Sequence, residues 1–287
     1  MDIGIGLPNA IPGTTGTALV DWARNAEGAG FSTLGTIGRL VYPNYEELVA
    51  LSAAAAVTTR IRLTTSVLIA PLYTNTALLA KQAASLDRLS GGRLVLGVAL
   101  GGRDDDYTAS GLSTEGRGRR LEEQLTGMKR IWAGEQLGHA GGIGPEPARR
   151  GGPELLLGGA TEASFRRAAR LGDGWIIGGT TPDNFAQAAT SVDKAWQDAG
   201  RPGKPRKVAL AYFAIGPAAR AQADTYLLDY YGWLGDIATQ ITAGAAVSAD
   251  MARAYAAAFT SAGCDELIFM PTASHPDQVG LLADAVL

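Results

Sequence analysis

Two glycine-rich segments have the composition and spacing that would let a protein hold a phosphate group. Gly158-Gly159-Ala160-Thr161 and Gly178-Gly179-Thr180-Thr181 each follow a short apolar run and precede a segment of helical periodicity. Glycine lets backbone amides approach an anion closely, and a helix N-terminus adds a favourable dipole. Two such loops in succession suit a phosphate. Tight strand-to-helix turns that need positive φ are the alternative interpretation.

Side chains that serve as acids, bases or nucleophiles are scarce at the predicted strand ends. The two histidines, His139 and His275, stand apart and do not make a metal site. No lysine follows a strand directly, which argues against Schiff-base chemistry. Asp104-Asp105-Asp106 is the one carboxylate cluster at a strand end, and it would suit a general acid or base, a divalent metal, or a solvated helix cap. We therefore predict that a bound cofactor supplies the chemistry.

The elements that must position these residues alternate along the whole chain. Short apolar runs predict strands at Ile3–Leu7, Phe31–Thr36, Arg60–Ile69, Arg93–Leu100, Glu154–Leu157, Trp175–Ile177, Lys207–Ile215 and Leu267–Met270. Amphipathic segments predict helices at Ala18–Ala29, Tyr45–Val57 with Asn44 as N-cap, Thr76–Leu89, Gly118–Trp132, Glu162–Leu171, Asn184–Ala199, Ala218–Tyr231 with more helix between Ile237 and Ala262, and Pro276–Val286.

This alternation is typical of a (β/α)8 TIM barrel, an α/β fold; an open doubly wound sheet is the alternative, and the number of strands favours the barrel. The glycine- and proline-rich segment from Gly138 to Gly152 is predicted to be a surface loop, because the alternation resumes after it. The chain, residues 1–287, is therefore predicted to form a single domain.

Composition excludes several function classes. A net charge of −3 gives no electrostatic reason to bind nucleic acid or an anionic membrane. Cys264 is the only cysteine, so no intrachain disulfide can form, and a cytoplasmic location is expected. A signal peptide is not expected, because no basic region precedes an apolar stretch at the N-terminus, and no apolar run is long enough to span a bilayer.

In a TIM barrel the active site lies at the carboxyl ends of the strands. That rule selects the segment from Thr64 to Leu68, the two glycine loops and the residues after strand four. The side chains that strand-end position places near the pocket are Asn9, Arg39, Tyr73, Arg103, Tyr107, Trp233 and Met270.

Several longer runs resemble the bacterial-luciferase-like oxidoreductase family. They are the stretch from Arg60 to Val67, the Leu86-Asp87-Arg88-Leu89-Ser90-Gly91-Gly92-Arg93 run, and the Leu171-Gly172-Asp173-Gly174-Trp175 run. The resemblance covers nearly the whole chain. It implies a (β/α)8 barrel that binds FMN or the deazaflavin coenzyme F420. It also implies a non-proline cis peptide bond at the end of strand three, here between Ser66 and Val67.

The resemblance places the cofactor phosphate at the same two glycine loops. The residues expected to bind the cofactor are Thr65, Ser66, Val67, Gly101, Gly158, Gly159, Ala160, Thr161, Gly178, Gly179 and Thr180.

One departure from the family pattern affects the chemistry. Many relatives carry an acidic residue followed by histidine at the end of strand two, where this chain has Gly38-Arg39. The usual histidine base is absent, and Arg39 is always charged and cannot replace it. Arg39 is expected to hold an anionic substrate or the charge of a reduced flavin; pairing with a surface carboxylate is the alternative. The candidate catalytic residues are Arg39, Asp105 and Tyr107.

The leading functional hypothesis is a monooxygenase that uses reduced FMN, fed by a separate reductase, to act on a small organic substrate with oxygen. The alternatives are a reductase that transfers hydride from coenzyme F420 to an imine or enone, and a catalytically silent flavin-binding barrel. A phosphosugar isomerase or hydrolytic barrel is disfavoured because strand-end lysine, histidine and paired glutamate are missing. The family resemblance also implies a homodimer.

Overall fold

The strands form a closed barrel in the computed structural model, which describes residues 1–136 and 138–287. Within these residues each strand pairs in parallel with the next, and β8 closes the barrel against β1. The strands are β1 (Asp2–Gly6), β2 (Thr33–Thr36), β3 (Arg62–Ile69), β4 (Leu94–Ala99), β5 (Glu154–Gly158), β6 (Gly174–Ile177), β7 (Arg206–Phe213) and β8 (Glu266–Pro271). The predicted barrel is confirmed, and the open sheet is excluded.

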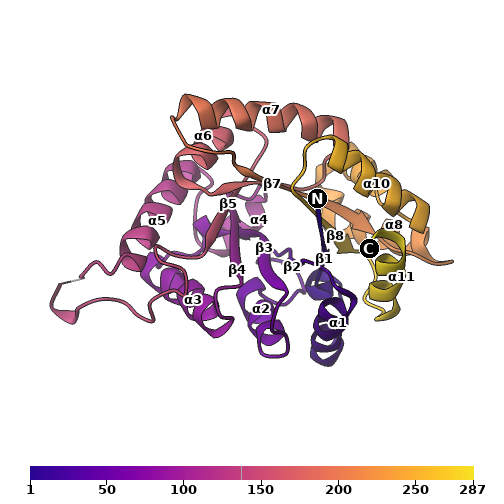
Figure 1. Ribbon diagram of the computed structural model, residues 1–287, viewed down its shortest axis with the longest axis horizontal. Helices are drawn as coiled ribbons and strands as arrows, with labels where there is room; N and C mark the ends of the chain where they lie inside the picture. The colour runs from indigo at the N-terminus through magenta and orange to yellow at the C-terminus, as the bar shows by residue number, and fades with distance from the viewer. Residues whose placement is uncertain (137) are drawn as a thin grey trace.

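Helices surround the barrel (Figure 1). They are α1 (Gly16–Ala29), α2 (Glu47–Ala55), α3 (Thr76–Leu89), α4 (Asp104–Ala109), α5 (Arg117–Trp132), α6 (Glu162–Leu171), α7 (Pro182–Asp198), α8 (Ala219–Tyr231), α9 (Asp236–Ala243), α10 (Ala249–Ser261) and α11 (Asp277–Val286). Most boundaries lie within a residue or two of the predicted ones. Gly30, with φ 97°, ends α1 in the left-handed conformation that only glycine adopts readily.

The predicted start of α2 was wrong. The N-cap is Glu46, which has extended backbone angles and a side chain that accepts a hydrogen bond from the Val49 amide at 2.7 Å. The side-chain amide of Asn44 donates instead to the Tyr45 carbonyl. A glutamate therefore caps this helix although shorter polar side chains are usually preferred.

The carboxylate cluster after β4 belongs to a short helix that sequence analysis treated as loop. Asp104, Asp105 and Asp106 fill the first turn of α4. Acidic side chains are favourable there because the helix N-terminus carries partial positive charge. The expected solvated cap is not what the structure shows, because the N-cap is Arg103 without a side-chain hydrogen bond and Asp106 is buried.

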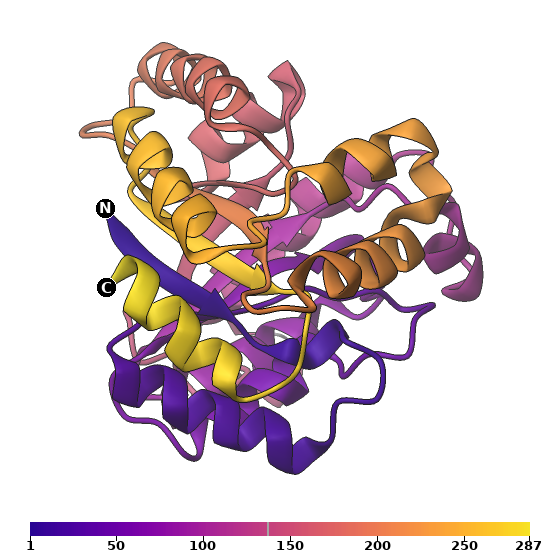
Figure 2. The same cartoon turned by 90° about the vertical axis from the view of Figure 1, so that its right-hand side faces the viewer.

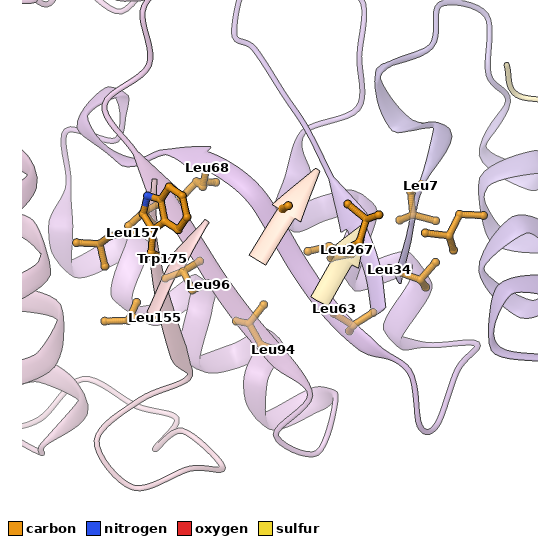
Figure 3. Close-up of a cluster of buried hydrophobic side chains, with 14 of the residues drawn as sticks. Leu7, Leu34, Leu63, Leu68, Leu94, Leu96, Leu155, Leu157, Trp175 and Leu267 are labelled. Carbon is orange, nitrogen blue, oxygen red and sulfur yellow. The ribbon is translucent and has the colours of Figure 1, made fainter. Parts of the chain in front are cut away.

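Alternate residues of each strand face opposite sides, which divides the core into two layers. Leu94, Leu96, Leu155 and Leu157 belong to the layer between strands and helices (Figure 3). Val95 and its counterparts on other strands fill the barrel interior. Apolar residues on both faces explain why the strands appear in the sequence as continuous apolar runs.

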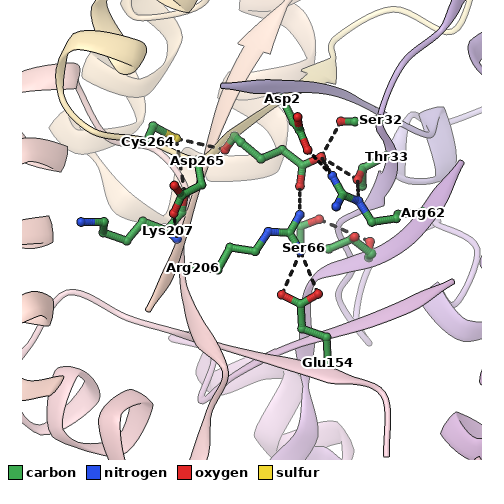
Figure 4. Close-up of polar contacts among 12 residues, drawn as sticks. Asp2, Ser32, Thr33, Arg62, Ser66, Glu154, Arg206, Lys207, Cys264 and Asp265 are labelled. Atoms are coloured by element: carbon green, nitrogen blue, oxygen red, sulfur yellow. Dashed lines mark hydrogen bonds and ion pairs between the residues drawn. The ribbon is translucent and has the colours of Figure 1, made fainter. Parts of the chain in front are cut away.

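A charged network lies at the amino ends of the strands, away from the predicted site (Figure 4). The Glu266 carboxylate, only 1% exposed, accepts hydrogen bonds from Thr33 at 2.7 Å and from Arg206 at 2.5 Å. Arg206 also pairs with Glu154 at 2.9 Å. These contacts join strands from both halves of the chain, as expected for the end of a TIM barrel that serves stability.

The connection from β7 to β8 adds helices at the opposite end of the barrel. Figure 2 shows α8 and α9 on the side away from the two termini. Tyr231, the last residue of α8, lines a cavity together with Val67 of β3 and Gly158, the last residue of β5. This connection therefore forms part of the wall around the carboxyl ends of the strands.

Candidate active site

A cavity of about 720 Å³ lies at the carboxyl ends of the strands. It gathers eight of the residues predicted to bind the cofactor: Ser66, Val67, Gly158, Gly159, Ala160, Gly178, Gly179 and Thr180. Ile37 of the β2–α2 connection and the tyrosines Tyr212 and Tyr231 complete much of its remaining wall. The volume lies within the range typical of cofactor pockets.

The first glycine loop is built as a helix start. Thr161 is the N-cap of α6, and its side chain and that of Ser164 form a capping box. Gly159 has φ 128°, and a Cβ there would lie 2.7 Å from the Ser164 Cβ. Glycine is therefore required by both backbone angle and space. Thr161 itself does not line the cavity, because its hydroxyl serves the cap.

The second glycine loop repeats this arrangement on the next strand. Gly179 has φ 63°, and Thr181 caps α7 by accepting a hydrogen bond from the Asn184 amide at 3.3 Å. Pro182 occupies the first turn of α7, where its missing N–H costs nothing. Two neighbouring helix N-termini thus border one cavity, which is an arrangement suited to an anion.

The end of β3 forms the floor between these loops and β2. The peptide bond between Ser66 and Val67 is cis, as predicted, and the pairing of β3 with β4 shifts register between Thr65 and Leu68. Ser66 and Val67 line the cavity. Thr65 does not, because its buried hydroxyl donates to the Gly97 carbonyl at 2.7 Å.

Gly101 also lies outside the lining of this cavity. Its φ is 68°, and a Cβ there would lie 2.8 Å from a methyl carbon of Ile69. It acts as a turn residue after β4 that packs against β3.

A second cavity, of about 370 Å³, adjoins the first along β2 and β3. Ile37 and Val67 line the larger cavity, whereas Arg39 and Ile69, each two residues further along, line the smaller one. Its other lining residues are Leu40, Tyr42, Asn44, Glu46, Glu47, Leu72 and Tyr73.

Arg39 is buried and points into an aromatic and acidic environment. Its side chain is 7% exposed and pairs with Asp105 at 2.7 Å. The guanidinium carbon lies 5.1 Å from the ring centre of Tyr42 and 5.6 Å from that of Tyr230. Its Nε is buried and has no hydrogen-bond partner among the residues described. The predicted pairing with a carboxylate is present, and one donor atom is left over.

Arg103 extends this cluster on the other side of Tyr230. Its guanidinium carbon lies 5.4 Å from the Tyr230 ring centre and 4.7 Å from that of Trp233. The guanidinium also donates to the Tyr230 carbonyl. The two arginines therefore lie near one tyrosine ring, which is favourable because cations are attracted to aromatic faces.

Other predicted residues have structural contacts instead. The buried Tyr107 hydroxyl donates to the Leu100 carbonyl at 2.5 Å, and Tyr107 lines neither cavity. Asn9 is buried and its amide donates to the Ile37 carbonyl at 2.8 Å. Met270 packs in the barrel interior near Gly6, and Tyr73 lines the smaller cavity.

Sequence reasoning missed Glu47, the first residue of α2. Its side chain lines the smaller cavity although the residue is only 6% exposed. Burial, together with the neighbouring charges of Glu46 and Asp106, raises the pKa of the Glu47 carboxyl to about 7. No signal in the sequence marks Glu47; its place becomes evident only in the structure, where a Cβ on Gly38 would lie 2.2 Å from the Glu47 Cδ.

Sequence reasoning also missed a group of tyrosines at the strand ends: Tyr212 comes from β7, and Tyr230 and Tyr231 come from α8. The hydroxyls of Tyr212 and Tyr231 are 2.5 Å apart. Burial raises the pKa of Tyr212 and Tyr230 well above the ordinary value, so both hydroxyls stay protonated. They can donate hydrogen bonds but cannot serve as bases near neutral pH.

Neither a metal site nor a membrane span is found in the described part of the chain. No group of three or more histidine, cysteine, aspartate or glutamate side chains in residues 1–136 and 138–287 is arranged to hold a metal ion. Over the same residues, no helix has the length and apolar content needed to cross a bilayer.

Comparisons with known proteins identify the family to which the chain belongs. A family model described as luciferase-like monooxygenase matches residues 1–271. The chain belongs to this family. The family predicted from the sequence is thereby confirmed.

Relatives differ in how much of the chain they cover. An uncharacterized protein of Mycobacterium tuberculosis (strain ATCC 25618 / H37Rv) is 36% identical over 172 residues, which are 56% of this chain and 60% of that protein. An FMNH(2)-dependent dimethylsulfone monooxygenase of Pseudomonas putida is 27% identical over 198 residues, 65% of this chain and 53% of that enzyme. The match therefore spans less than two thirds of the length of either relative.

One solved structure illustrates the shared fold. An F420-dependent secondary alcohol dehydrogenase in complex with an F420-acetone adduct superposes with a TM-score of 0.81. The match covers 99% of this chain and 98% of that one, at 14% sequence identity. At this identity the likeness concerns the fold alone.

Proposed function

We propose that the chain is a monooxygenase that uses reduced FMN, supplied by a separate reductase, to act on a small organic substrate with oxygen. The observation that carries the proposal is the larger cavity, where two glycine loops at helix N-termini face the end of β3. The relative from Pseudomonas putida, whose printed name specifies FMNH(2), supports the choice of cofactor.

The residues of the larger cavity fit such a cofactor. The amides around Gly159 and Gly179 would hold the phosphate, because helix N-termini favour negative charge. Ser66 and Val67 would lie beneath the ring. Reduced flavin, when bound, supplies the electrons for the reaction with oxygen.

The chain's own side chains would orient the reactants and exclude water. Tyr212 and Tyr231 remain neutral hydrogen-bond donors at the cavity wall. Arg39 would stabilise negative charge on the reduced ring or on the substrate through its unpaired Nε. Asp105 would fix the Arg39 side chain through their 2.7 Å ion pair.

A second candidate is a reductase that uses reduced coenzyme F420, and the charge of the larger cavity favours it. None of the described residues that line this cavity carries a charged side chain. A phosphate monoester such as that of FMN carries roughly two negative charges near pH 7. The phosphodiester of F420 carries one, which an uncharged lining accommodates at lower cost.

Titration of the purified protein with each cofactor separates these functions. Fluorescence titration with reduced FMN and with reduced F420, both without oxygen, would give the two dissociation constants. We expect micromolar or tighter binding of reduced FMN. Tight binding of F420 with no binding of FMN would overturn the first candidate in favour of the second. Binding without turnover of any substrate would instead identify a silent flavin-binding barrel.

A further inference from the structure

Glu47 places a buried carboxyl group at the edge of the smaller cavity. The residue begins α2 and is 6% exposed, and its neighbours in the cavity lining include Ile69 and Leu72. The smaller cavity lies next to the larger one, because the chain segments at the carboxyl ends of β2 and β3 contribute residues to both. A group at Glu47 therefore lies beside the space that a cofactor ring over Ser66 and Val67 would leave for a substrate.

The polar groups around Glu47 are committed to other partners. Arg39 pairs with Asp105 at 2.7 Å. The Tyr73 hydroxyl donates to Glu46 at 2.7 Å, and the amide of Val41 donates to Asp106 at 2.7 Å. No ion pair found among residues 1–136 and 138–287 neutralises the Glu47 carboxylate.

The groups that face Glu47 from neighbouring elements favour its neutral form. Glu46 precedes it in α2, and Asp106 faces it from α4; both add negative charge. Tyr73 from the connection between β3 and α3 and Tyr230 from α8 interact with it as neutral hydroxyls. Its own amide at the start of α2 favours the charged form, but burial outweighs this, so that the pKa is about 7.

We propose that Glu47 is the general acid of the reaction and that the smaller cavity binds a small, uncharged substrate through an acceptor oxygen. In this step the O–H bond of the Glu47 carboxyl breaks, and a new O–H bond forms on the substrate oxygen where negative charge develops. The electron pair of the broken bond stays on Glu47, which becomes a carboxylate and regains a proton from water later in the cycle. The electrons for the reaction come from the reduced cofactor, so this inference rests on the proposed function.

Arg39 fits this role for Glu47. Its guanidinium lines the same cavity and keeps one Nε–H without a partner. That donor would stabilise both the developing oxyanion and the carboxylate left after proton transfer. Because Arg39 is already paired with Asp105, the donor that it offers a substrate is the single Nε–H, which an uncharged acceptor oxygen can use.

The first test needs no cofactor. Protein labelled with ¹³C at glutamate Cδ would be titrated by NMR, with the Glu47→Gln variant identifying the Glu47 signal. We expect this carboxyl to titrate near pH 7, while exposed glutamates titrate near their ordinary value. A Glu47 signal that titrates with the exposed glutamates overturns the inference, whatever the cofactor proves to be.

The second test measures turnover against pH with two probes: reduced FMN, oxygen and dimethyl sulfone, or reduced F420 and acetone. The Glu47→Gln variant should lose about a hundredfold or more in kcat with little change in KM. Glu47→Asp should recover part of the loss, and the rate of the parent protein should fall above pH 7. The exposed Glu115→Gln serves as the matched control and should behave as the parent protein.

These outcomes distinguish a failure of the role proposed for Glu47 from a failure of the proposed function. A Glu47→Gln variant that keeps kcat within threefold of the parent overturns the role of Glu47 but leaves the proposed function intact. Failure of the parent protein to bind either cofactor overturns the proposed function. In that case the NMR titration still decides whether Glu47 is held neutral in the cavity.

Discussion

The carboxyl of Glu47 lies directly against the backbone of Gly38. A Cβ on residue 38 would come within 2.2 Å of the Glu47 Cδ and 2.3 Å of one carboxyl oxygen. Glycine at this position therefore provides the space in which the first residue of α2 reaches the end of β2. The contact joins two chain segments that the sequence alone would treat as a loop and a solvated helix start.

Replacing Gly38 with alanine should displace the Glu47 carboxyl from its buried position. We expect the Gly38→Ala variant to lose about 1–3 kcal/mol of unfolding free energy, because the added methyl has no room. The pKa of Glu47 should fall toward that of an exposed glutamate, which ¹³C NMR would detect. Gly28→Ala is the control: a Cβ there meets nothing within 4 Å in α1, so this change should stabilise the protein slightly. Equal effects of the two substitutions would contradict the packing argument.

The raised pKa of Glu47 should make stability depend on pH in a defined direction. The carboxyl has a pKa of about 7 in the folded protein against an ordinary 4.5, so the folded state binds its proton more tightly. The stabilisation that this tighter proton binding contributes is complete below pH 4.5 and is lost as pH rises through 7. The loss in unfolding free energy is roughly 3 kcal/mol at most. Urea denaturation at pH 5 and pH 8 should show this loss in the parent protein. The Glu47→Gln variant should lack it, and an equal slope in both proteins would refute the assignment.

The barrel and the conformation of the two glycine loops could be predicted because their signals are local. Each strand is apolar on both faces, and Gly159 and Gly179 stand directly before helix starts. The conformational freedom of glycine is visible in any sequence. The cis bond between Ser66 and Val67 was predicted in a different way, from the family resemblance.

The rest of the site could not be predicted because it depends on burial by distant segments. Glu47 stands in the sequence as an ordinary acidic residue in the first turn of a helix. Tyr73 and Tyr230, which help to surround it, come from the connection between β3 and α3 and from α8. Tyr107 is the opposite case. Its position after β4 predicted a place in the pocket, but its hydroxyl donates to the Leu100 carbonyl.

At acidic pH the stability of the protein should depend on Glu27. Burial alone would raise the pKa of its carboxyl, but hydrogen bonds from the amides of Ile61, Arg60 and Thr59 lower it to about 2. Because the folded pKa lies below the ordinary 4.5, this stabilisation is complete above pH 4.5 and is lost as pH falls toward 2. Glu27→Gln should reduce the change in thermal midpoint between pH 5 and pH 3. An unchanged difference would show that the amide contacts do not persist in solution.

Changing Gly159 should weaken cofactor binding more than it weakens the fold. A Cβ there would lie 2.7 Å from the Ser164 Cβ, at a φ of 128° that other residues rarely adopt. The Gly159→Ala variant should therefore shift the first glycine loop, and under the proposed function it should raise the Kd of the cofactor about tenfold or more. Gly151→Ala is the control, because Gly151 has φ 87° but open space around it. This control should lose about 1 kcal/mol of stability and keep the parent Kd. Equal Kd values for both variants would argue against a phosphate at this loop.

The network at the amino ends of the strands should affect stability and leave the site unchanged. Glu266 is 1% exposed and pairs with Arg206 at 2.5 Å and with Arg62 at 3.3 Å. Removing its charge in Glu266→Gln leaves Arg206, whose side chain is 18% exposed, with Glu154 as its remaining acidic partner. Breaking a buried ion pair in this way typically costs about 3–5 kcal/mol, which urea denaturation would measure. The exposed pair of Arg130 and Glu135 supplies the control, since Glu135→Gln should leave the midpoint unchanged. Because the network lies at the end of the barrel away from the cavities, the Kd of the cofactor should be the same in both variants. A higher Kd in Glu266→Gln alone would show that the two ends of the barrel are coupled.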